Sequence, residues 1–162
     1  MKNSPKNNPP KKKTKPHPPF LAVDGKERFK THAEVLNDVF HQKTQEGKDF
    51  RLALGSVWPL DTGGYVCFFP LAEQTKGGWH APHDTSWLNI PSPDERTLTQ
   101  IRLPGAPEET PIPSGAHCAV FVRDGDKGYR FFGKFTRTEP SQGIARWKRR
   151  AAAIVWPDKP KP

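Results

Sequence analysis

The apolar residues of this chain gather in short runs that are separated by Gly, Pro and charged residues. Residues 63–72 (GGYVCFFPLA) contain a continuous apolar run, which is typical of a strand buried on both faces. The strongest pattern lies at residues 117–137, where two apolar runs flank the turn sequence RDGDKG and predict a β-hairpin. Shorter apolar or alternating runs predict further strands at residues 20–25, 49–60 and 97–105. Residues 151–157 favour a last strand, with a short helix as the alternative.

One segment, residues 31–47, has the pattern of a helix instead. Thr31 is a candidate N-cap, and Glu34 follows three residues later, which is the spacing of a capping box. Gly47 is a plausible C-cap residue. A single apolar stripe at helical spacing supports this prediction, and it consists of Val35, Leu36, Val39 and Phe40.

Two stretches rich in Pro, Gly and polar residues, 72–96 and 104–115, are expected to be loops. One helix followed by about six short strands predicts an α+β, mostly β fold. The architecture that fits best is a small, partly closed β-barrel with the N-terminal helix on its side, and a two-sheet sandwich is the alternative.

The positive charge of the chain is concentrated near its N-terminus. Residues 1–19 hold six Lys, no acidic residue and one apolar residue, so we expect a disordered basic tail. The whole chain carries +9, but residues 20–162 have 20 basic against 17 acidic residues and carry only +3. The tail lysines Lys11, Lys12, Lys13 and Lys15 are candidate phosphate contacts without sequence preference, and a merely solubilising tail is the alternative.

The domain organisation follows from this composition. We expect a single β-rich domain at residues 20–156 and a second short tail at residues 157–162. No signal peptide and no membrane insertion are expected, because no apolar run approaches about 20 residues. Cys67 and Cys118 lie in apolar runs and are expected to be reduced core thiols. A cytoplasmic location is therefore expected, or a nuclear one in a eukaryotic host, because KKKTK is typical of import signals.

Catalytic motifs are weak in this sequence. His80 and His83, with Asp84, His117 and the two cysteines, offer the ligand types of a zinc site, but the sequence contains no CxxC pair. It also contains no G-x-S-x-G elbow, no phosphate loop and no dinucleotide fingerprint. We therefore favour a protein without catalytic activity or cofactor, and we keep a metal-dependent hydrolase as an alternative.

Aromatic and basic residues carry more information. Trp79, Trp87 and Trp147 lie in polar segments, where an aromatic ring can stack on a base. Trp147 is flanked by four cations that suit phosphate groups: Arg146, Lys148, Arg149 and Arg150. The alternative is that Trp147 anchors the chain end in the core, because strand alternation places Arg146, Lys148 and Arg150 on the face opposite it.

Residues 111–140 resemble the central hairpin of PUA-like barrels, the superfamily that includes the EVE, ASCH and SRA domains. The resemblance rests on Ser114-Gly115, CAVFV, the turn RDGDKG, and YRFFGKF with its internal Gly133. It implies a small barrel that binds RNA or a modified base in DNA through an aromatic-lined pocket, for which Trp79, Trp87 and Tyr129 are the candidates. Gly133 is expected to allow a strand bend or a close approach.

The leading hypothesis is a non-catalytic nucleic-acid-binding module, for RNA or a modified base, with a basic tail that adds affinity. A protein-interaction module, accessory or inhibitory, is the second hypothesis, because exposed Trp residues are frequent interface anchors. The metal-dependent hydrolase is the third.

Overall fold

The computed structural model describes residues 20–51, 53, 55–81, 87–106, 112–123, 125 and 127–155. The two predicted tails, residues 1–19 and 157–162, lie outside this part of the chain. Within it the structure is mostly β, as predicted, with a single short helical segment.

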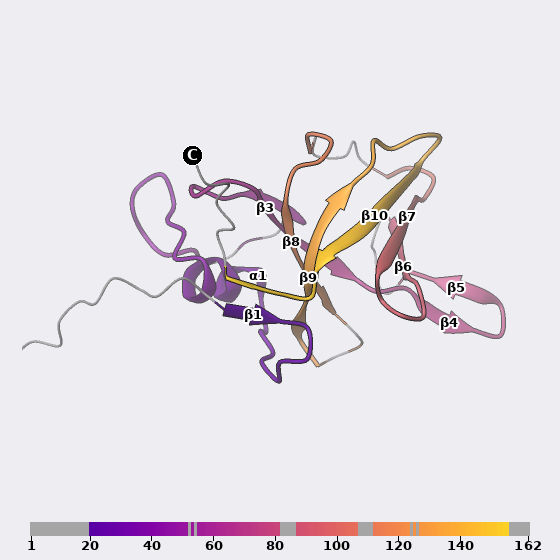
Figure 1. Ribbon diagram of the computed structural model, residues 1–162, viewed down its shortest axis with the longest axis horizontal. Helices are drawn as coiled ribbons and strands as arrows, with labels where there is room; N and C mark the ends of the chain where they lie inside the picture. The colour runs from indigo at the N-terminus through magenta and orange to yellow at the C-terminus, as the bar shows by residue number, and fades with distance from the viewer. Residues whose placement is uncertain are drawn as a thin grey trace, which may run out of the picture.

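A seven-stranded sheet forms the main body of the described residues (Figure 1). Only the pair β3 and β8 is parallel, and the other neighbours are antiparallel. The strands follow the order β2 (Val57–Pro59), β3 (Tyr65–Pro70), β8 (Cys118–Arg123), β9 (Tyr129–Arg137), β10 (Ile144–Ala151), β7 (Thr97–Arg102) and β6 (Trp87–Pro91). The hairpin predicted at residues 117–137 is the pair β8–β9, and it is confirmed.

Two small antiparallel pairs accompany this sheet. Strand β1 (Phe20–Ala22) pairs with β11 (Ala153–Val155), which confirms the predictions at both ends of the domain. Strands β4 (Glu73–Thr75) and β5 (Gly78–His80) form a hairpin that projects beside β6 (Figure 1). The prediction of a loop at residues 72–96 is therefore wrong, because this segment contains the hairpin and β6. Short strands with exposed polar residues leave no apolar alternation in the sequence.

The helical segment is shorter than predicted. It begins as α1 (His32–Glu34), and Thr31 caps it by accepting a hydrogen bond from Glu34 N at 3.1 Å. It continues as a π-helical turn, η1 (Val35–Val39). His41 then adopts a positive φ of 52°, and Gln42 N donates to Leu36 O at 2.8 Å, which ends the helix well before residue 47. The predicted C-cap at Gly47 is wrong, because this residue lies in a separate turn.

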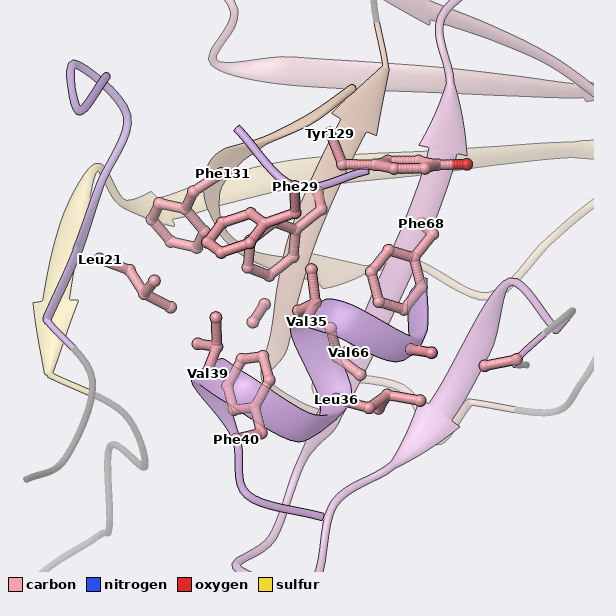
Figure 2. Packing of buried hydrophobic residues seen from close by; sticks show 14 of the residues in the cluster. Leu21, Phe29, Val35, Leu36, Val39, Phe40, Val66, Phe68, Tyr129 and Phe131 are labelled. Carbon is pink, nitrogen blue, oxygen red and sulfur yellow. The ribbon is translucent and has the colours of Figure 1, made fainter. Parts of the chain in front are cut away.

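Strands β3, β8 and β9 are buried on both faces, so the sheet separates two hydrophobic cores. On one face, the helical segment packs its apolar stripe against side chains of the three strands (Figure 2). The labelled members of this core include Val35, Leu36, Phe40, Val66, Phe68 and Phe131. The second core, on the other face, contains Cys67, Phe69, Val120, Phe132, Phe135 and Trp147.

A bulge interrupts the pairing of β9 with β8. Val120 pairs with Gly133 and Phe121 with Phe131, so Phe132 is an extra residue in the ladder. The rings of Phe131 and Phe132 enter different cores, because successive side chains of a strand point to opposite faces. Gly133 has a φ of 136°, and a Cβ atom there would lie 2.7 Å from Arg149 Nε. The close approach expected at Gly133 is therefore present.

The sheet curves strongly, and its far end returns to β3. The rings of Phe69 on β3 and Trp147 on β10 lie 5.3 Å apart. Just beyond β3, Ala72 N donates to Asn89 O of β6 at 2.8 Å. No ladder among the described strands joins β3 to β6, so the structure shows a curved, mostly open sheet rather than a closed barrel.

The number and extent of the strands also differ from the prediction. The described residues form eleven strands instead of about six. Of the described residues in the strand predicted at residues 49–60, only Val57–Pro59 forms a β-strand. Leu52 and Leu54 lie outside the described residues. Phe50 instead packs edge-on against Trp58, with ring centroids 5.4 Å apart. Phe50 and Ala53 pack in the helix-side core.

Candidate nucleic-acid interface

Strand β10 presents a row of cations on one side. Arg146, Lys148 and Arg150 are exposed, and they alternate with the buried Ala145 and Trp147. This arrangement follows from the two-residue period of a strand. The predicted opposition between the three cations and Trp147 is confirmed.

The strand register surrounds this row with threonines. On β7, Thr99 lies opposite Arg146 and Thr97 lies opposite Lys148. On β9, Thr136 lies opposite Lys148, and its hydroxyl accepts a hydrogen bond from Arg150 Nε at 2.8 Å. Directly paired residues share a face of the sheet, so these side chains form one surface. We call it the threonine–cation face; its residues are Thr97, Thr99, Thr136, Arg146, Lys148 and Arg150.

The charges on this face are not neutralised by the described part of the chain. Among the described residues, ion pairs join Lys43 to Asp49 and Arg130 to Glu95, and neither pair involves the threonine–cation face. The threonines were missed by sequence reasoning, because only the cross-strand register brings β7 and β9 beside β10.

Trp147 is a core residue and has no free ring face for a base. Its side chain is 1% exposed, and its indole Nε1 donates to Gln100 Oε1 at 2.6 Å. The guanidinium of Arg137 lies 5.7 Å from the centre of the ring. The candidate stacking role of Trp147 is therefore corrected to that of a core anchor.

Arg149 belongs to the same side of β10 as Trp147. Its guanidinium lies over the stacked rings of Phe132 and Phe135, at 5.2 and 5.6 Å from their centres, and it donates to Phe132 O. Burial lowers the pKa of Arg149. Arg149 is thus held against the second core, and it does not join the threonine–cation face.

Tyr129 is also buried, with 6% of its surface exposed. Its hydroxyl lies 2.9 Å from His32 Nε2, and its ring packs edge-on against Phe68 in the helix-side core. The ring therefore lines no open aromatic pocket. Trp87, the first residue of β6, is half-buried opposite Arg102.

Trp79 is the exposed tryptophan of the described residues. It lies on β5, in a hairpin whose six strand residues are all exposed, and 38% of its surface is accessible. Because β5 contacts β6, the hairpin extends the sheet on the side of β6 and β7. Trp79 is the candidate that retains a ring face for stacking.

Among the described residues, no cluster of metal-ligand side chains supports a zinc site. His80 is exposed on β5 and His83 lies outside the described residues, among which no three metal-ligand side chains gather. Cys67 and Cys118 are free and buried, as predicted. Burial, together with a hydrogen bond to Cys118, raises the pKa of the Cys67 thiol, which makes it a poor nucleophile.

Comparisons of the whole chain with models of known protein families and with curated proteins give no match. No helix in the described part of the chain has the length and apolar character needed to cross a membrane. The tail candidates Lys11, Lys12, Lys13 and Lys15 lie outside the described residues. The threonine–cation face and Trp79 are therefore the candidate binding surfaces of the described residues.

Proposed function

We propose that this protein is a non-catalytic nucleic-acid-binding module and that the threonine–cation face contacts the phosphate backbone. The observation that carries the proposal is the row Arg146, Lys148 and Arg150, exposed on one strand and without described carboxylate partners. Phosphate contacts of this kind come from Arg and Lys together with Ser and Thr hydroxyls. The flanking threonines supply such hydroxyls.

Base contact is assigned to Trp79. Stacking of a base on an aromatic side chain contributes about 1–3 kcal/mol and tolerates any sequence. The resemblance of residues 111–140 to PUA-like barrels supports RNA or a modified DNA base as the ligand, and it supports the assignment of the curved sheet to that architecture. The basic tail adds affinity that does not depend on sequence.

The test is a salt titration of oligonucleotide binding. The variant Arg146→Gln/Lys148→Gln/Arg150→Gln should bind single-stranded and duplex probes more weakly. Its slope of log K against log salt should be shallower by about 2–3, because each lost phosphate contact removes about 0.7–0.9. The matched control is Lys26→Gln/Lys48→Gln/Arg51→Gln, which removes three exposed charges outside the threonine–cation face and the β4–β5 hairpin. Equal effects of the two variants, or no binding by the unaltered chain at low salt, would overturn the proposal.

Trp79 also supports the alternative of a protein-interaction module, because an exposed aromatic ring on a projecting hairpin suits an interface anchor. The two functions separate in a pull-down with Trp79→Ala. Loss of a stoichiometric protein partner, with oligonucleotide binding unchanged, would favour protein interaction. A nucleic-acid reader instead loses oligonucleotide affinity and keeps its salt slope, because stacking releases no counterions.

A further inference from the structure

A pocket of about 340 Å³ lies where residues 28–30 cross the end of the β8–β9 hairpin. Six described residues line it; four of them are cations, and none of these six is acidic. They are Arg28, Phe29, Lys30, Arg123, Lys127 and Gly128. None of these residues belongs to the threonine–cation face.

The backbone holds the two sides of this pocket together. Phe29 N donates to Tyr129 O at 2.9 Å, and Tyr129 N donates to Phe29 O at 2.6 Å. Gly128 has a φ of 83°, and a Cβ atom there would lie 2.7 Å from Phe29 O, so only glycine permits this approach. The pocket is therefore a pre-formed feature of the fold.

Burial of Phe29 directs its charged neighbours outward. Figure 2 shows the Phe29 ring in the helix-side core, where it packs edge-on against Phe121 at 5.9 Å. Arg28 and Lys30 flank Phe29 and are exposed. Because successive side chains of an extended segment point to opposite sides, both cations lie on the side away from the core.

The described lining of this pocket carries four cationic side chains. None of its four cations makes an ion pair with a carboxylate of the described residues. Arg28 Nη1 donates to Gly25 O and Glu27 O, at 3.2 and 2.8 Å, which restrains its guanidinium. Burial lowers the pKa of His32 and raises the pKa of Tyr129, while the positive charge of Arg123 lowers both. The charge of Arg123 therefore acts on both of these neighbouring groups.

We propose that this pocket binds a phosphate group. A phosphate monoester carries close to two negative charges and three acceptor oxygens, which match two guanidinium groups and two ammonium groups. The volume lies in the range of about 300–1,000 Å³ that is usual for small-ligand pockets, so the pocket accommodates more than a bare ion. The phosphate belongs either to a small free compound or to the end of a nucleic-acid strand. The proposal does not depend on the threonine–cation face.

In the first experiment, the full-length protein is titrated with inorganic phosphate and with pyrophosphate at constant ionic strength. Binding is measured by calorimetry. Saturable binding to one site is expected. The variant Lys30→Gln/Lys127→Gln should lower the affinity at least about tenfold, because two charge-assisted contacts are lost. Both side chains are exposed, so the fold should be retained. The variant Arg123→Lys keeps the charge but removes the two-pronged hydrogen bonding, and it should lower the affinity less.

The control is Arg146→Gln/Lys148→Gln, which removes the same charge from the threonine–cation face and should leave phosphate binding unchanged. The proposal is overturned if no saturation occurs by about 10 mM phosphate, which corresponds to a binding free energy weaker than about 3 kcal/mol. Equal binding by Lys30→Gln/Lys127→Gln would overturn it as well.

The source of the phosphate is distinguished with two oligonucleotides of one sequence, with and without a 5′-phosphate. A preference for the phosphorylated strand that disappears in Lys30→Gln/Lys127→Gln supports the pocket as a reader of strand ends. Equal binding of both strands, with saturable phosphate binding retained, supports the pocket as a site for a small phosphate compound.

Discussion

At the scale of the residue, burial decides what each aromatic side chain does. Trp79 and Trp147 both have polar and charged neighbours in the sequence, and yet one is exposed and the other is almost completely buried. The alternating burial along β10 places Trp147 in the second core. The six exposed residues of the β4–β5 hairpin leave Trp79 on the surface.

His32 links burial to a dependence of stability on pH. Its ring stacks on Phe68 at 4.1 Å, its Nδ1 donates to Gly55 O at 3.0 Å, and its Nε2 lies 2.9 Å from the Tyr129 hydroxyl. A carbonyl only accepts, so the neutral ring carries its proton on Nδ1 and Nε2 accepts from Tyr129. Protonation of Nε2 would break this arrangement.

Burial lowers the pKa of His32 below its ordinary value of 6.5, so the folded state disfavours the charged ring. The stabilisation is complete above the unfolded-state pKa, and it is lost as the pH falls from there to the folded-state pKa, because only the unfolded chain takes up the proton in that window. His32→Gln should cost about 1–3 kcal/mol at neutral pH. The difference from the unaltered chain should shrink as the pH falls from about 7.5 to 5.5, measured by urea unfolding. Parallel curves for the two proteins would contradict this assignment, because the other histidines contribute equally to both.

At the scale of the element, a buried chain of polar side chains ties the curved sheet together. Trp147 Nε1 of β10 donates to Gln100 Oε1 of β7 at 2.6 Å, and Gln100 Nε2 donates to Asn89 Oδ1 of β6 at 2.7 Å. Asn89 Nδ2 then donates to Pro70 O at the end of β3, at 2.9 Å. The chain connects strands from the two ends of the main sheet, so it stabilises the curvature.

Replacement of Gln100 tests the role of this chain. Gln100→Leu leaves the Trp147 N–H and the Asn89 carbonyl buried without their partner, and each such group costs about 1–3 kcal/mol. We expect a loss of about 2–4 kcal/mol in the free energy of unfolding, measured by chemical denaturation. Gln45→Leu makes the same change at an exposed position and should alter stability by less than about 0.5 kcal/mol. A comparable loss in both variants would exclude a specific role for the buried chain.

At the scale of the whole molecule, the charge is unevenly distributed. The chain carries +9, and the six lysines of residues 1–19 account for all but +3 of it. The net charge of residues 20–162 is therefore modest, and their positive sites are local. The threonine–cation face and the phosphate pocket are two such sites.

Deletion of residues 1–19 should weaken nucleic-acid binding without changing sequence preference. The slope of log K against log salt on duplex DNA should become shallower by up to about 5, because six lysines account for at most six phosphate contacts. A full-length variant with the six lysines replaced by glutamine should show the same change, which separates charge from chain length. An unchanged slope in both proteins would assign the tail to solubility alone.

Local sequence patterns predicted several elements of this fold, because these elements form through interactions between residues close together in the sequence. The β8–β9 hairpin follows from two apolar runs around a Gly- and Asp-rich turn, and the helix start follows from the Thr31 cap. The predicted end of the helix was wrong, because a π-turn and the positive φ of His41 end the helix before the polar residues that lead to Gly47. The β4–β5 hairpin was missed, because its six exposed residues show no apolar alternation. Strand β6 was missed because Trp87–Pro91 lies between Pro- and Gly-rich segments that are typical of loops.

For the candidate site, the alternation along residues 144–150 determined that Arg146, Lys148 and Arg150 share one face, since a strand has a period of two. Only the tertiary structure decided which face is open to solvent and which threonines join it, because both depend on strands far apart in the chain. The phosphate pocket could not be predicted from the sequence for the same reason. Residues 28–30 meet Arg123, Lys127 and Gly128 where the backbone of Phe29 pairs with Tyr129, and a contact across so long a sequence separation leaves no local pattern.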